Sequence, residues 1–138
     1  RTENGRCVAT MKTPGGHTRG EWECESAYLD EALPKLAALG APEAIGALQA
    51  DALLPVCGAK FTRITAELTL DGGTRCAVCG DVGELTGGGQ KQLLCELELE
   101  LTEGSEQTMQ AYADSLMAQF HLSEQPLSKL QRARALTK

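Results

Sequence analysis

The sequence predicts an α+β fold in which hairpin-linked antiparallel strands are flanked by helices. Strands are indicated by runs that alternate charged and apolar residues, most clearly Cys95-Glu96-Leu97-Glu98-Leu99-Glu100-Leu101. Helices are indicated by apolar residues at helical spacing, and glycine-rich turns separate consecutive strands. With 138 residues, the chain suits a single domain over 1–138 with one core.

The first part of the chain is predicted to form a hairpin followed by helices. Pro14-Gly15-Gly16 is typical of the hairpin turn, and Pro34 is expected to kink or break the first helix. In chain order, the elements are a strand over 6–12, a strand over 18–25, a helix capped by Ser26 and ended by Gly40, and a short helix from Pro42 to about Leu54.

The second part is predicted to form three strands, a helix and a tail. Asp71-Gly72-Gly73 is typical of a hairpin turn, and Ser105 of a helix cap. In chain order, the elements are strands over 60–70 and 74–81, a flexible loop over 86–92, a strand over 93–101, a helix from Ser105 to about His121, and a tail from Pro126.

Composition narrows the classes of partner. The net charge of −6 disfavours a nucleic-acid polymer as the main partner. The sequence has no apolar run of membrane-spanning length and no signal peptide, so we expect a cytoplasmic protein without a membrane partner. Six cysteines include the pair Cys76-Ala77-Val78-Cys79, which has no matching second pair for zinc. We expect these cysteines to be reduced and structural.

Two strands carry rows of carboxylates on one face: Glu21-Glu23-Glu25 and Glu96-Glu98-Glu100. One interpretation is a solvated outer face above a buried apolar face. The other is a face on which cations offset the charge, because adjacent like charges repel. Divalent metal is one such cation. The basic side chains of the strand regions are another, namely Lys12, Arg19, Arg63 and Arg75.

A face with both carboxylates and basic residues suits a triphosphate with its metal. Basic groups bind phosphate oxygens, and carboxylates hold an ion that bridges them. The basic tail, with Lys129, Arg132 and Arg134, has two interpretations. It is either a solvated end or a lid that closes on phosphate.

The order of motifs resembles the CYTH superfamily of triphosphate tunnel metalloenzymes, which includes thiamine triphosphatases, inorganic triphosphatases and class IV adenylate cyclases. The resemblance covers nearly the whole chain. The motifs are Val8-Ala9-Thr10-Met11-Lys12, Arg19-Gly20-Glu21-Trp22-Glu23, Phe61-Thr62-Arg63, Asp81-Val82-Gly83-Glu84-Leu85, Glu96-Leu97-Glu98-Leu99-Glu100 and Leu127-Ser128-Lys129-Leu130-Gln131-Arg132.

The resemblance implies a charged tunnel closed by antiparallel strands. Phosphate would be bound by basic residues of the matching motifs: Lys12, Arg19, Arg63, Lys129 and Arg132. Mg²⁺ or Mn²⁺ would be held by acidic ones: Glu96, Glu98, Glu21, Glu23 and Asp81. Glu96, Glu98 and Lys12 are the predicted catalytic residues.

The chain also departs from the family. The Glu-x-Glu-x-Lys strand that begins the family, and the strand after it, are not found, so we expect an N-terminally truncated domain and a partial tunnel. Two copies pairing through exposed strand edges could complete a shared barrel. Two functions are therefore open. One is metal-dependent hydrolysis of an inorganic or organic triphosphate. The other is an inactive module that binds polyphosphate or nucleotide, or acts through oligomer assembly.

Overall fold

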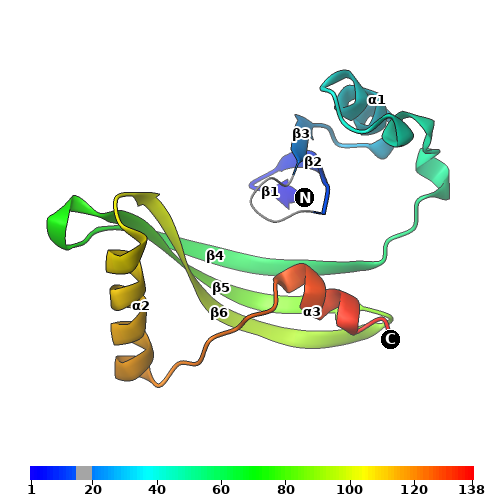
Figure 1. The fold of residues 1–138 in the computed structure, drawn as a ribbon. Helices are drawn as coiled ribbons and strands as arrows, with labels where there is room; N and C mark the ends of the chain where they lie inside the picture. Colours follow the sequence, from blue (N-terminus) through cyan, green and yellow to red (C-terminus); the bar gives the residue numbers. More distant parts are fainter. Residues whose placement is uncertain (15–19) are drawn as a thin grey trace. The chain divides into compact units, whose positions relative to one another are not determined.

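A computed structural model describes residues 1–14 and 20–138. The chain forms two compact units, Arg1–Leu54 and Pro55–Lys138, which we describe separately (Figure 1). Each unit holds one three-stranded antiparallel sheet, with strand orders β1-β2-β3 and β4-β5-β6. The predicted α+β class with antiparallel strands is therefore confirmed.

The N-terminal sheet consists of β1 (Thr2–Glu3), β2 (Arg6–Lys12) and β3 (Glu21–Glu25). Strands β2 and β3 pair with each other in the antiparallel sense, and their register places Lys12 opposite Glu21 and Val8 opposite Glu25. The predicted turn at Gly15-Gly16 and the predicted phosphate ligand Arg19 lie outside the described residues. The alternation in β3 places Trp22 and Cys24 on the side that packs against the helices of this unit.

Helix α1 (Leu29–Ala38) supplies the buried Leu33 and Leu36 of the N-terminal core. The prediction of a break at Pro34 is wrong. Pro34 lies on the exposed side of α1, where water can satisfy the carbonyl that loses its amide partner. The helix begins after Tyr28 and not after Ser26. The serine hydroxyl instead donates to the backbone oxygen of Tyr28 at 2.9 Å.

The prediction of a short helix from Pro42 to about Leu54 is also wrong. This segment contains two short 3₁₀ helices, η1 (Glu43–Ala47) and η2 (Ala50–Ala52), with extended backbone at Leu48 between them. Neither begins with a side-chain cap, and Gly46 lowers the helical propensity of the first. Short 3₁₀ turns are a common outcome where a full helix is not stabilised.

The C-terminal sheet consists of three long strands, β4 (Cys57–Thr69), β5 (Arg75–Gly87) and β6 (Gln90–Glu103). The 3₁₀ turn η3 (Asp71–Gly73) joins β4 to β5 and confirms the hairpin turn predicted at these residues. The tip predicted over 86–92 is a hairpin turn, but a much shorter one than the predicted flexible loop. Gly88 and Gly89 both have positive φ and form a two-residue hairpin turn, so the ladder continues to Gly87 opposite Gln90.

The two faces of this sheet differ in what they carry. One face holds exposed apolar side chains, including Ile64, Val82 and Leu93. The other holds Arg63, Asp81 and Glu96, which are register partners across the three strands. The register alternation therefore places Arg63, Asp81 and Glu96 on a single face, which we call the charged face.

Helix α2 (Glu106–Phe120) follows the sheet and confirms the predicted helix in this region. The Ser105 hydroxyl accepts a hydrogen bond from the Thr108 amide at 3.3 Å, as its predicted capping role requires.

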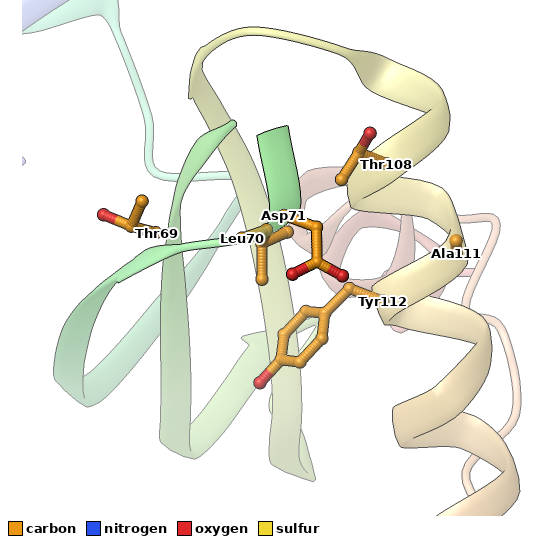
Figure 2. A pocket seen from close by; sticks show the side chains of 6 residues that line it. All are labelled: Thr69, Leu70, Asp71, Thr108, Ala111 and Tyr112. Carbon is orange, nitrogen blue, oxygen red and sulfur yellow. The ribbon is translucent and has the colours of Figure 1, made fainter. Parts of the chain in front are cut away.

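An open pocket of about 390 Å³ lies between α2 and the β4–β5 turn (Figure 2). Asp71 is the one charged residue in its lining. The lining residues are Thr69, Leu70, Asp71, Thr108, Ala111 and Tyr112.

The tail predicted from Pro126 contains a helix, α3 (Lys129–Ala135). It lies across the charged face of the C-terminal sheet (Figure 1). Its Ala133 joins the buried Leu85 and Leu94 of the sheet in a small apolar core. Among the described residues, no helix is long and apolar enough to cross a membrane.

The C-terminal sheet has β4 and β6 at its two edges. A tunnel would need further strands along these edges. Among residues 1–14 and 20–138, the strands of each unit form an open three-stranded sheet. The tunnel, the truncation relative to the family and the single domain over 1–138 therefore stay predictions.

Candidate metal and phosphate site

The backbone register of the C-terminal sheet assembles the site. Arg63 on β4 lies opposite Asp81 on β5, which lies opposite Glu96 on β6. Two residues further along β6, Glu98 lies opposite Cys79 on the same face. Three carboxylates and a guanidinium that are distant in sequence are therefore adjacent in the sheet.

The carboxylates of Asp81, Glu96 and Glu98 each place one oxygen within 4.8 Å of the others. Their exposure differs, with side-chain exposed fractions of 0% for Asp81, 14% for Glu96 and 45% for Glu98. The cluster is thus closed at Asp81 and open to solvent at Glu98. A ligand would reach it from the side of Glu98.

Arg63 holds Asp81 in a two-pronged ion pair. Its Nε and Nη2 atoms each lie 2.7 Å from a different oxygen of the carboxylate. Nη2 also donates to Glu98 at 2.9 Å. The hydrogen bonds from Arg63, assisted by Lys129, lower the pKa of Asp81 to about 2 against the opposing effect of burial. The same pair raises the pKa of Arg63, so both groups are charged at neutral pH.

Helix α3 adds two more cations to the cluster. Lys129 Nζ lies 2.8 Å from Asp81 Oδ2 and 2.5 Å from Glu96 Oε1, and it also bonds Glu98 Oε1. Arg132 Nη2 lies 2.5 Å from the other oxygen of Glu96. Burial opposes ionisation of Glu96, but the bonds from Lys129 and Arg132 hold its pKa below the usual value. The three carboxylates face three cations, so the cluster is balanced in charge.

The position of α3 follows from its cap and from a close approach to the sheet. Ser128 and Gln131 form a reciprocal capping box, with bonds of 3.1 and 2.8 Å. Gly87 at the end of β5 permits the approach, because a Cβ atom there would lie 2.3 Å from the backbone oxygen of Ala133. The helix therefore places Lys129 and Arg132 over the carboxylates.

The donor set fits a hard divalent cation. Mg²⁺ binds oxygen ligands at about 2.0–2.1 Å, so opposite ligands in its octahedron are about 4.2 Å apart. The three carboxylate oxygens already lie within 4.8 Å of one another. At most one pair of the three can be opposite, and adjacent ligands are about 2.9 Å apart, so a bound ion would draw the carboxylates closer together and its remaining positions would go to water or substrate oxygens.

Not all the predicted site residues belong to the unit that holds this cluster. Lys12, Glu21 and Glu23 belong to the N-terminal unit. There Lys12 Nζ lies 3.6 Å from Glu21, and Glu23 accepts bonds from Arg1 and Thr10. The predicted roles of these residues, and that of Arg19, stay predictions.

Sequence reasoning missed Phe61, whose ring lies beneath two of the cations. Lys129 Nζ is 5.1 Å and the Arg63 guanidinium carbon 5.7 Å from the ring centroid. The face of the aromatic ring attracts both positive charges. The sequence could have indicated this contact, because Phe61 lies two residues before Arg63 on one strand and therefore shares its face.

A scan against models of known protein families finds no match to this chain.

Proposed function

We propose that the charged face of β4–β6 binds a triphosphate together with Mg²⁺ or Mn²⁺ and hydrolyses it, as a metal-dependent triphosphate hydrolase of CYTH type. The observation that supports this proposal is the convergence of three carboxylates with three basic side chains on one face. The order of the sequence motifs supports the family type.

The residues divide into two roles. The carboxylates of Asp81, Glu96 and Glu98 hold the metal, which when bound polarises the terminal phosphoryl group and positions water. Arg63 binds phosphate oxygens through its guanidinium fork, which suits two oxygens at once. Lys129 and Arg132 bind from α3 on the opposite side of the ligand. These cations offset charge that develops on the phosphoryl oxygens.

Glu98 is the best placed of the three carboxylates to accept a proton from attacking water. Asp81 has a pKa of about 2 because of its pair with Arg63, and a base that weak is inefficient at neutral pH. Glu96 is held by both cations of α3 and has a lowered pKa. Glu98 is the most exposed and lies at the open side of the cluster.

A second candidate function is binding of polyphosphate or nucleotide without turnover. The charge balance favours it, because Lys129 bonds all three carboxylates that would hold metal. In such a module, phosphate would compete with the carboxylates for the three cations. Metal would then be dispensable for binding.

The hydrolase proposal is tested by phosphate release from tripolyphosphate with and without Mg²⁺ or Mn²⁺. We expect release that depends on the divalent ion. Glu98→Gln should remove most of it, by roughly 100-fold or more, because both a ligand and a proton acceptor are lost. Glu100→Gln is the matched control, since it removes the next carboxylate on the same face of β6, outside the cluster.

Phosphate release that is unaffected by Glu98→Gln, or absent with every triphosphate tried, would contradict the hydrolase. Calorimetry with tripolyphosphate then identifies the second candidate. Binding that survives removal of metal, without release of phosphate, is the result expected for a non-catalytic module.

We further propose that two copies pair through strand edges to complete a barrel. The long edge strands support this, since β4 has 13 residues and β6 has 14. Sedimentation at micromolar concentration tests it. A monomer under those conditions rules out this assembly.

A further inference from the structure

We propose that Lys129 is an internal cation that excludes a free divalent metal from the cluster, so that metal and polyphosphate enter the site together. The metal ion binds the carboxylates while the phosphate oxygens bind Lys129 and Arg132. This inference rests on the metal site of the proposed function and adds to it the form in which the site accepts its ligand.

The contacts of Lys129 show first that it occupies the oxygens a metal would use. Its ammonium group bonds Asp81, Glu96 and Glu98, which are the same three side chains that form the candidate metal cluster. Its side chain is only 16% exposed, so the ammonium group is largely shielded from solvent where it contacts the carboxylates. A metal that binds these oxygens must therefore displace a bound cation.

Charge balance carries the second step. The three carboxylates are neutralised by Arg63, Lys129 and Arg132. A divalent ion that enters alone leaves the cluster with excess positive charge in a partly buried position, where charges are poorly screened. A polyphosphate brings several negative charges and offers new partners to the displaced cations. Entry of the two ligands together restores the balance.

The docking of α3 carries the third step. The helix is held by its apolar residues Ala133 and Leu136 against Leu85 and Leu94, and it reaches the sheet because Gly87 has no side chain. These contacts hold Lys129 over the carboxylates without any ligand. Weakening them should therefore open the cluster to metal even though every charge remains in the chain.

The test compares Mn²⁺ affinity among variants, using the electron paramagnetic resonance signal of unbound Mn²⁺ and no phosphate. Lys129→Met should bind Mn²⁺ more tightly than the original chain, by roughly tenfold or more, because the competing charged bonds are gone. Lys91→Met is the matched control. It removes a lysine that pairs with Glu84 at 2.9 Å on the opposite face of the sheet, and should leave the affinity unchanged.

A second pair of variants separates competition from simple loss of charge. Gly87→Ala should displace α3 and also tighten Mn²⁺ binding, and faster hydrogen exchange over 129–135 verifies the displacement. Gly80→Ala is its control on the same strand, because a Cβ atom there makes only an ordinary contact of 3.7 Å with Leu97.

Tighter Mn²⁺ binding by Lys129→Met and Gly87→Ala, but not by their controls, supports the inference. It is overturned if neither variant gains affinity, if Lys91→Met gains as much as Lys129→Met, or if no variant binds Mn²⁺. If Lys129→Met does not fold, Gly87→Ala decides. Failure of the hydrolase would appear separately, as absent phosphate release in a chain that still shows this pattern of affinities.

Discussion

The two acidic strand rows of this chain have the same sequence pattern and different surroundings. In the N-terminal unit, carboxylates of β3 pair with cations at the surface. For example, Arg6 lies 3.1 Å from Glu25, whose side chain is 65% exposed. In the C-terminal unit, Glu96 and Glu98 join Asp81 beneath α3, where Lys129 bonds all three.

This difference shows that an acidic row becomes a candidate site when other elements converge on it. A row of alternating glutamates on one strand is stable in water, where charges are screened and pairs contribute little. In the C-terminal unit, two neighbouring strands add Arg63 and Asp81, and a helix covers the row with two more cations. The difference therefore lies in the coverage of the row and not in its glutamates.

The largest expected effect concerns stability, and it compares the cluster that Asp81 forms with the C-terminal row against the N-terminal row. Asp81→Asn should lower the free energy of unfolding by roughly 3 kcal/mol, because Arg63 and Lys129 lose a buried charged partner. Glu23→Gln, the matched change in the N-terminal row, should lower it by less than about 1 kcal/mol. Urea unfolding followed by circular dichroism measures both. Equal effects would show that the cluster around Asp81 and the N-terminal row are energetically alike.

The next effect is the response to acid. Because the folded state lowers the pKa of Asp81 from 3.8 to about 2, its contribution is present above pH 3.8 and is lost as pH falls toward 2. The contribution is at most about 2 kcal/mol. The stability difference between the original chain and Asp81→Asn should therefore narrow over this window. A difference that stays constant from pH 4 to pH 2 would contradict the pairing.

The smallest expected effect concerns the cap of α3. Ser128→Ala removes the side-chain acceptor for the Gln131 amide and should weaken α3 by about 1 kcal/mol. Faster hydrogen exchange over 129–135 measures the change. The corresponding change Ser105→Ala should act on α2 alone, because Ser105 accepts from Thr108 at the start of that helix. Faster exchange in α3 on changing Ser105 would show that the two helices are coupled.

Local patterns were sufficient to predict much of the fold. The alternation around Glu96 and Glu98 predicted β6, and the Ser105 cap with its apolar face predicted α2. Several local predictions failed for physical reasons. Pro34 is tolerated on an exposed side of α1, Gly88-Gly89 forms a tight turn and not a loop, and α3 was assigned to a tail. The spacing of Ser128 and Gln131 was the available signal for α3.

The residues of the cluster were among the candidates from the sequence, but their contacts were not predicted. Asp81, Glu96, Glu98, Arg63, Lys129 and Arg132 were all candidate residues from the order of motifs. Their division into ion pairs depends on strand register, and a shift of one residue would move each side chain to the other face. The contact between the Phe61 ring and Lys129 depends on the same register.

By itself, the sequence determined which side chains share a face, because strand and helix periods are local properties of the backbone. It determined the antiparallel strands, the acidic rows and the supply of basic residues. Only the tertiary structure decided which row is covered. That outcome depends on the docking of α3 over β4–β6, where the absent side chain of Gly87 and the apolar contact of Ala133 allow Lys129 to reach three carboxylates at once.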